Sequence, residues 1–347
     1  MKPIVSFADF KSWIGTRATF VLSLALVLLM VPLAVEAQHD GKMHRIAFVH
    51  FPERLSTIGS AGLEVFRQAL REHGWIEGKN YVLETRLGAS DEKLPEVSAQ
   101  VVREKFDLII VSNTFAAMAV RDATTTIPIV MAGACDPVEC GVVSSLAHPE
   151  GNVTGLTIIT SELAGKRVEF LKEAVPGLKR IAALTYGHDT FCVRRAWMSQ
   201  TEATARALGI TLQTTSVDPG MSAEQWDVTF AALRKDGVGA VTVMEGTIFN
   251  LHAPRITAAA LKHGLPTVFA FRSQAVAGGL MSYGANTATM WRRGAYFVDR
   301  ILRGTKPGDL PIEQPTAFEL TINLKTAKAL GIAIPSSLRL RTDHVIE

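Results

Sequence analysis

The feature that most restricts the fold of this chain is an internal duplication of a strand–helix pattern. The tripeptide Arg-Ile-Ala opens an apolar run at Arg45 and opens another at Arg180. In both places a helical pattern follows and ends at a glycine, Gly74 or Gly209, 29 residues after the arginine. Glycine at this position is typical of a helix C-terminus. The shared order and spacing predict two lobes of the same fold.

Apolar runs alternate with helical patterns along the rest of the chain. Most of the runs are apolar throughout, as expected of strands buried on both faces of a parallel sheet. We therefore expect an α/β protein with two doubly wound, Rossmann-like parallel sheets, one in each lobe. The expected strands are 45–51, 81–87, 107–112 and 127–132 in the first lobe and 180–186, 211–217, 240–244 and 266–271 in the second. The expected helices include 59–73, 92–104, 191–208 and 222–235.

Residues 1–37 have the pattern of an export signal. Lys2, Lys11 and Arg17 precede an apolar run at 20–35, and Ala37 ends a segment suited to a signal peptidase. This order is that of a secretory signal peptide, so we expect cleavage near Ala37 and a periplasmic mature chain. A retained membrane anchor is the alternative, although the apolar run of 16 residues is shorter than the roughly 20 of a membrane span.

The mature chain is nearly balanced in charge. Its roughly 310 residues exceed what one core comfortably fills and include 33 Lys and Arg against 31 Asp and Glu, a net charge of +2. This balance gives no reason to expect nucleic acid or an anionic membrane as a partner.

Three cysteines, Cys135, Cys140 and Cys192, do not suggest a disulfide framework. If one bridge forms, Cys135 and Cys140 are the closest pair; the alternative is that all three are small buried residues.

The strand ends supply candidate ligand contacts. Ligands of open α/β sheets bind beyond the carboxyl ends of the strands, so two facing lobes predict a cleft that closes about a hinge. Asn113 and Thr114 suit the start of a helix that receives a carboxylate, against the alternative of a plain cap. The candidates are Phe51, Ser56, Asn113, Thr114, Asp136, Tyr186, Glu245, Arg272 and Tyr283.

The charged candidates each have a second interpretation. Asp136 and Glu245 are acids at opposite strand ends, suited to an ammonium group, but Asp136 before Pro137 also suits a turn. Arg272 suits a ligand carboxylate or an ion pair with Glu245. The nucleotide, serine-nucleophile and zinc motifs are missing from the sequence. We therefore expect a binding protein without enzyme activity, cofactor or metal.

Five segments in order resemble the ABC-transporter substrate-binding family that includes tryptophan-binding lipoproteins. They are IPIV at 127–130, DPV at 136–138, HPEGNVTG at 148–155, GGLMSYG at 278–284 and FELTINLKTAKALG at 318–331. The resemblance covers essentially all of residues 43–347. It implies a type I periplasmic-binding-protein fold, with 43–158 and 279–323 in the N-terminal lobe and 159–278 and 324–347 in the C-terminal lobe.

The resemblance also implies a function. A protein of this family captures a small molecule between its lobes and delivers it to an inner-membrane permease with its ATPase; we expect a monomer. Family ligands include aromatic amino acids. The resemblance implies cleft positions for Asn113, Thr114, Asp136, Glu245, Arg272 and Tyr283. The chain has no lipobox, and Tyr186-Gly187 stands where relatives have an Asn-Pro turn, so another carboxylate or aromatic ligand stays open.

Other functions fit parts of the sequence. A sensory protein that docks on a membrane kinase or chemoreceptor has the same fold and export signal. A cofactor-independent amino-acid racemase also has two similar lobes and needs a thiol from each. Cys135 and Cys192 lie in different expected lobes, but Ser112 precedes Asn113 where a racemase has its cysteine. A sugar-binding transcription regulator is disfavoured, because the export signal occupies the place of its DNA-binding helices.

Overall fold

The computed structural model describes residues 42–50, 57–88, 93–158, 160–186, 192–218 and 220–347. The expected export signal at 1–37 and the expected ligand contacts Phe51 and Ser56 lie outside these ranges. Within them, no helix is long and apolar enough to cross a membrane.

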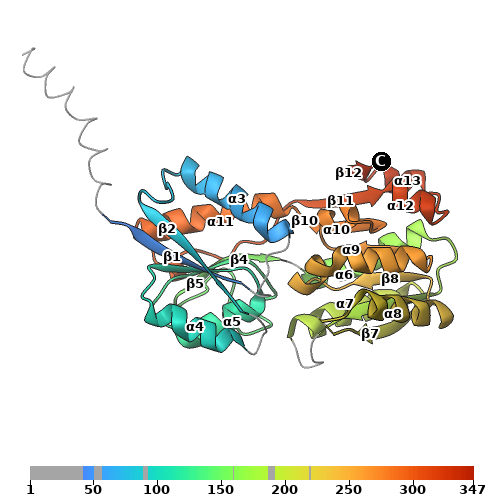
Figure 1. Cartoon of the computed structure of the whole chain (residues 1–347), viewed down its shortest axis with the longest axis horizontal. Helices are drawn as coiled ribbons and strands as arrows, with labels where there is room; N and C mark the ends of the chain where they lie inside the picture. The colour runs from blue at the N-terminus through green and yellow to red at the C-terminus, as the bar shows by residue number, and fades with distance from the viewer. Residues whose placement is uncertain (1–41, 51–56, 89–92, 159, 187–191, 219) are drawn as a thin grey trace, which may run out of the picture. The chain divides into compact units, whose positions relative to one another are not determined.

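The first lobe is built on a five-stranded parallel sheet with the strand order β2-β1-β3-β4-β5 (Figure 1). Its strands are β1 (His44–His50), β2 (Tyr81–Leu87), β3 (Leu108–Val111), β4 (Ile129–Cys135) and β5 (Val153–Ile158). Its helices are α3 (Thr57–Glu72), α4 (Leu94–Arg103) and α5 (Thr114–Ala123). All four residues of β3 are buried, as its continuous apolar pattern predicts. The four expected strands are confirmed, and β5 is an addition.

The second lobe has a seven-stranded sheet with the order β12-β11-β10-β9-β8-β6-β7, parallel except between β10 and β11. Its strands are β6 (Arg180–Thr185), β7 (Thr211–Ser216), β8 (Ala240–Val243), β9 (Thr267–Phe269), β10 (Met281–Ala285), β11 (Phe318–Asn323) and β12 (His344–Ile346). Its helices are α6 (Thr160–Ala174), α7 (Cys192–Ala207), α8 (Ala223–Lys235), α9 (Thr247–Lys262), α10 (Arg272–Val276), α12 (Leu324–Ala329) and α13 (Ser336–Arg339). The expected α/β class with two largely parallel sheets is confirmed.

The duplication is present in the geometry. Ile46 lies opposite residues of β2 and β3, and Ile181, the matching residue of the second copy, lies opposite residues of β7 and β8. In each copy, the helix that follows the first strand ends in the same way. Gly74 and Gly209 have positive φ, and the amide of the next residue donates back into the last turn of the helix. Trp75 donates to the carbonyl of Leu70 at 2.9 Å, and Ile210 donates to the carbonyl of Ala205 at 2.8 Å. A helix that stops like this needs a residue tolerant of positive φ, which explains the two glycines.

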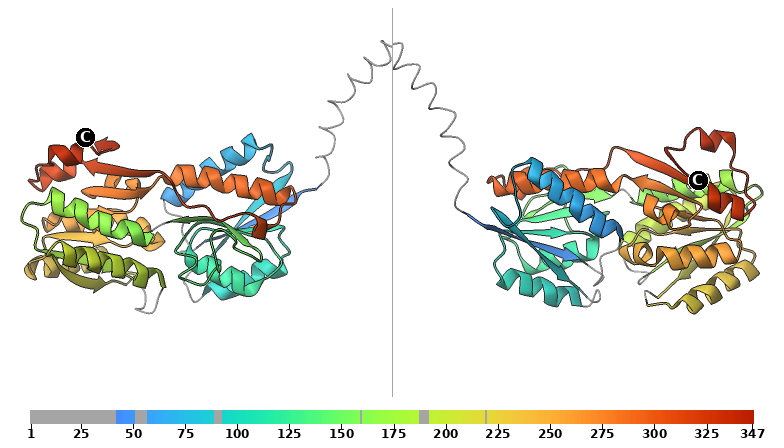
Figure 2. Two further views of the ribbon diagram at one scale, coloured as in Figure 1. Left: turned by 180° about the vertical axis from the view of Figure 1, so that it is seen from behind. Right: turned by 45° about the horizontal axis from the view of Figure 1, so that its top comes forward.

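The expected lobe bounds are wrong for two strands. We expected 279–323 in the N-terminal lobe, but β10 pairs with β9 and with β11 in the second sheet. Met281 and Ile322 are buried in the core of the second lobe. The helix between them, α11 (Thr287–Leu302), packs in the first-lobe core instead, beside α3 (Figure 2). The strands stay with the second sheet because their backbone groups pair there, while the amphipathic helix buries its apolar face in the first lobe.

Candidate functional site

A cavity lies between residues at the carboxyl ends of strands from both sheets. Its volume is about 110 Å³, well above the roughly 10–15 Å³ that a single water needs. The first lobe lines it with His50, Ser112, Asn113, Thr114, Phe115, Ala132, Gly133, Cys135 and Ile158, and α11 adds Thr287, Met290 and Trp291. The second lobe lines it with Tyr186, Val193, Glu245, Gly246, Asn250 and Phe271. The wall is mainly apolar and aromatic with a few polar groups, the usual composition of a small-molecule site.

Four candidates from the sequence line this cavity: Asn113, Thr114, Tyr186 and Glu245. Asn113 is the N-cap of α5, and its side chain accepts a hydrogen bond from the amide of Ala116 at 2.9 Å. The Thr114 hydroxyl bonds the backbone of Cys135 in both directions, at 2.8 and 2.9 Å. Asn113 therefore caps the helix, and the same helix N-terminus, with its partial positive charge, forms part of the cavity wall. Binding of a ligand carboxylate at this point stays a prediction.

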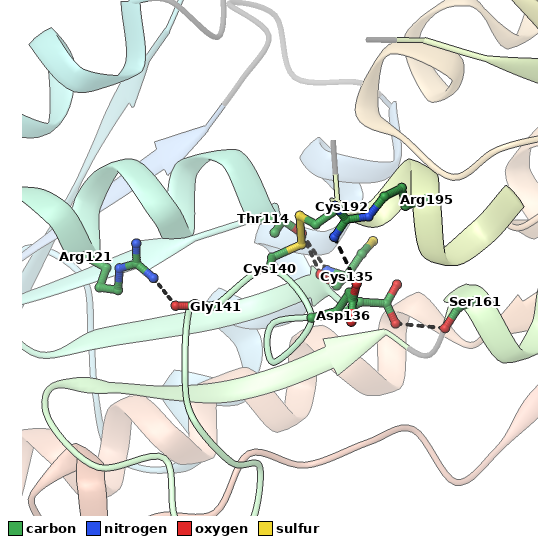
Figure 3. Close-up of a disulfide and its surroundings, with 10 residues drawn as sticks. Thr114, Arg121, Cys135, Asp136, Cys140, Gly141, Ser161, Cys192 and Arg195 are labelled. Carbon is green, nitrogen blue, oxygen red and sulfur yellow. Dashed lines mark hydrogen bonds and ion pairs between the residues drawn. A yellow bond between two sulfur atoms is a disulfide. The ribbon is translucent and has the colours of Figure 1, made fainter. Parts of the chain in front are cut away.

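Asp136 is not among the lining residues. Its backbone has a φ of 43°, and its carboxylate accepts a hydrogen bond from the Ser161 hydroxyl at 3.0 Å (Figure 3). Its carbonyl accepts from the amide of Cys140 at 3.0 Å, which closes a turn. The structure therefore gives Asp136 the turn role that the sequence offered as the alternative.

Arg272 and Tyr283 are also absent from the lining residues. Arg272 is exposed at the start of α10. The Tyr283 ring packs against Phe170, with the ring centroids 4.9 Å apart, and against Phe318 at 6.2 Å. Tyr283 is thus a packing residue of the second lobe, and its backbone carbonyl accepts a hydrogen bond from Arg167 at 2.8 Å.

Glu245 is paired with an arginine that the sequence did not single out. Arg167 of α6 forms an ion pair with the Glu245 carboxylate, and both side chains are 1% exposed. Apart from this ion pair, neither carboxylate oxygen has a hydrogen-bond partner among the described residues. Burial raises the pKa of Glu245 above its usual value, and the charge of Arg167 opposes that rise.

His50 is a second lining residue that was not among the candidates. It is 2% exposed, and its Nδ1 lies 2.5 Å from the Ser112 hydroxyl oxygen. Its Nε2 is buried and makes no hydrogen bond within the described part of the chain. Burial lowers the pKa of His50 to about 4, so the ring is neutral at pH 7. Both residues could have been found from the sequence, because ligands bind beyond the carboxyl ends of the strands, and His50 ends β1 while Ser112 follows β3.

Two further groups of lining residues were missed for different reasons. Asn250 lies one turn inside α9, and its Oδ1 is buried without a hydrogen-bond partner among the described residues. Met290 and Trp291 come from α11, which enters the first lobe only after the chain has built most of the second. No local pattern marks such a return of the chain.

A disulfide joins Cys140, in the loop after β4, to Cys192 at the start of α7, with the Cα atoms 5.3 Å apart (Figure 3). Both interpretations offered by the sequence are therefore wrong, because the bridge does not join Cys135 to Cys140 and the three cysteines are not all unbridged. The turn begun by Asp136 carries Cys140 toward the second lobe, whereas Cys135 ends β4 and lines the cavity. An ion pair between Glu139 and Arg195, at 3.1 Å, flanks the disulfide. The described residues contain no cluster of three His, Cys, Asp or Glu that could hold a metal ion.

Comparison with known proteins identifies the family to which the chain is similar. A family model described as ABC transporter substrate binding protein matches residues 48–346. A curated tyrosine-binding protein of Clostridioides difficile (strain R20291) is 26% identical over 273 residues, which are 77% of this chain and 75% of that protein.

Solved structures share the fold. A conserved domain protein of Vibrio cholerae superposes with a TM-score of 0.80 at 24% identity, covering 88% of this chain and 100% of that one. A domain from Streptococcus pneumonia in complex with L-Trp gives a TM-score of 0.78, also at 24% identity, with the same coverage. A solute binding protein of an ABC transporter from Agrobacterium vitis, with bound allitol, gives 0.58 at 16% identity, covering 83% of this chain and 97% of that one. The expected periplasmic-binding-protein fold is thereby confirmed.

Proposed function

Because the chain belongs to the family of ABC transporter substrate-binding proteins, we propose that it is an extracytoplasmic receptor for an amino acid with an aromatic side chain. The ligand occupies the cavity between the lobes, and the loaded protein delivers it to the permease and ATPase of an importer. The observation that carries this proposal is a mainly apolar cavity lined by both lobes, in which His50 of the first lobe and Asn250 of the second each carry a buried polar atom without a hydrogen-bond partner among the described residues.

The polar groups of the cavity suit the two charged ends of an amino acid. The N-terminus of α5 offers partial positive charge to a carboxylate. From the opposite lobe, the Glu245 carboxylate and the Asn250 carbonyl oxygen are hydrogen-bond acceptors suited to an ammonium group. Among the described residues that line the cavity there is no Lys or Arg to pair with a second carboxylate, which disfavours a ligand that carries one.

The apolar part of the cavity suits an aromatic side chain. Tyr186, Phe271 and Trp291 contribute rings to its wall, and Met290 adds an adaptable thioether. The curated relative is a tyrosine-binding protein, and one structural neighbour was solved with L-Trp, which supports the same ligand class.

A racemase function is not supported by the cysteines. Such an enzyme needs one thiol from each lobe for proton transfer. Cys192 of the second lobe is bonded to Cys140, so it has no thiol to offer. We therefore propose a binding protein without enzyme activity.

The proposal is tested by melting the purified mature protein with each of the twenty amino acids. A ligand that binds only the folded state, present at a hundred times its Kd, adds about 2.7 kcal/mol of stability and raises the Tm. We expect the largest shifts from aromatic amino acids and little from aspartate or glutamate. If no amino acid shifts the Tm, the proposal is wrong. Loss of uptake of the labelled ligand in cells that lack the gene, restored by the wild-type gene, tests delivery to an importer.

A further inference from the structure

His50 lines an aromatic part of the cavity wall. Its ring stacks on Phe48, with the centroids 5.7 Å apart and the planes 19° from parallel. Phe48 in turn packs edge-on against Trp291 at 5.9 Å. His50 and Trp291 both line the cavity. A side chain that enters among these rings therefore meets apolar surface together with one imidazole.

The two nitrogens of His50 have different surroundings. Nδ1 is engaged by the Ser112 hydroxyl at 2.5 Å, which fixes the orientation of the ring. Nε2 is buried and has no hydrogen-bond partner among the described residues. Buried polar atoms in native proteins are nearly always hydrogen-bonded, so an unpartnered nitrogen on a residue that lines a cavity indicates a missing partner, such as a ligand or a water.

The imidazole is neutral, which restricts the kind of partner. Its depressed pKa of about 4 means that one nitrogen carries a proton and the other accepts at pH 7. A neutral ring suits an uncharged hydroxyl or N–H group of the ligand better than a carboxylate or an ammonium group. The carboxylate and the ammonium have more suitable places at the N-terminus of α5 and at Glu245.

We propose that His50, oriented by Ser112, is a specificity-determining residue that hydrogen-bonds the uncharged polar atom of the ligand's side chain. The inference rests on the proposed function and deepens it: the cavity selects an aromatic side chain with a ring hydroxyl or ring N–H over a pure hydrocarbon of similar shape. Both groups are donors, so Nε2 accepts, and Nδ1–H donates to the oxygen of Ser112. Tyrosine and tryptophan carry such a group, and phenylalanine does not.

Calorimetric titration with L-tyrosine, L-tryptophan and L-phenylalanine tests the inference. The wild type should bind tyrosine or tryptophan about tenfold more tightly than phenylalanine, because leaving a buried acceptor without its partner typically costs about five- to hundredfold in affinity. His50→Phe keeps an aromatic ring at this position and should reduce that preference to about twofold or less, with the affinity for phenylalanine largely retained. Ser112→Ala should reduce the preference in part, because it frees the orientation of the imidazole.

A matched control is available outside the cavity. Thr242 is fully buried in β8, and its hydroxyl has no hydrogen-bond partner among the described residues, but it is not among the lining residues. Thr242→Val should leave the tyrosine-to-phenylalanine ratio unchanged. If His50→Phe does not fold, His50→Gln supplies an acceptor of similar reach and should keep part of the preference.

The outcomes separate the inference from the proposed function. Binding of all three amino acids with equal affinity by the wild type overturns the inference and leaves the proposed function standing. The same holds if the His50 variants keep the full preference of the wild type. If none of the three amino acids binds, the inference and the proposal of an aromatic amino-acid receptor are both wrong.

Discussion

Arg167 of α6 and Glu245 at the end of β8 form an ion pair in which both side chains are 1% exposed. The Nε of Arg167 also donates to the carbonyl of Tyr283 at 2.8 Å, so one guanidinium connects α6, β8 and β10. Burial alone favours a protonated Glu245, and Arg167 counters that preference. The carboxylate in the cavity wall therefore depends on Arg167 for its charge.

Arg167→Met removes the compensating charge and leaves the Glu245 carboxyl buried alone. We expect the free energy of unfolding to fall by about 3–5 kcal/mol, the range found when one partner of a buried ion pair is removed. Urea denaturation measures the change. The double variant Arg167→Met/Glu245→Gln should recover a large part of it, because the remaining side chain carries no charge. Equal instability of the single and double variants would contradict this account.

The parts of the fold that depend on local pattern could be predicted from the sequence. A continuous apolar run marks a strand buried on both faces, and a glycine after an amphipathic segment marks the end of its helix. The same local logic places Asn113 and Glu245 at strand ends, and both line the cavity. His50 and Ser112 follow the same rule, since His50 ends β1 and Ser112 follows β3, but neither is among the candidates from the sequence.

The remaining parts depend on contacts between distant segments. Asp136 looks like a ligand-binding acid until its φ of 43° and its bond to Ser161 are known. The pairing of β10 with β11 is decided by competition between two sheets, which the residues of either strand do not encode alone. The partner of Cys140 is set by the path of the turn before it, so the nearer Cys135 is the wrong choice.

The Cys140–Cys192 disulfide should add substantial stability. It closes a loop with a sequence separation of 52 residues, for which the chain-entropy model gives about 4 kcal/mol. We expect Cys192→Ser to lower the free energy of unfolding by about 2–4 kcal/mol in urea under non-reducing conditions. Cys135→Ser is the control and should change the stability far less.

Peptide mapping identifies the bond directly. Non-reducing digestion of the oxidised protein should yield a peptide pair joined through Cys140 and Cys192. A linked pair containing Cys135 would show that the connectivity differs from the structure.

The stability of the protein should depend on pH through His50. The pKa of His50 is about 4 in the folded protein against an ordinary value of 6.5, so between these two pH values the unfolded chain binds more protons. This contribution is fully present above pH 6.5 and is lost as the pH falls toward 4, to a total of about 3 kcal/mol. The neighbours that fix the ring, Ser112 and Phe48, are uncharged.

His50→Phe removes this titration and isolates its effect. Between pH 7 and pH 4, the unfolding free energy of the wild type should fall by about 3 kcal/mol relative to that of His50→Phe. Chemical denaturation at several pH values measures it. A constant difference across this range would mean that the histidine titrates near its ordinary value in the folded protein.

The close approach of α3 and α11 depends on Gly62. A Cβ at this position would lie 2.0 Å from Nε1 of Trp291, so the indole fits only because the side chain is a hydrogen. Gly62→Ala gains helix propensity of about 1 kcal/mol but forces the indole to move, at about 1–3 kcal/mol for overpacking. We expect a net loss of stability and, because Trp291 lines the cavity, a weaker affinity for the ligand. Gly74→Ala, which meets no atom within 4 Å but has a φ of +89°, is the contrasting control. Gly74→Ala should lower the stability through backbone strain and leave the affinity for the ligand unchanged. If Gly62→Ala also binds the ligand with unchanged affinity, Trp291 does not shape the site.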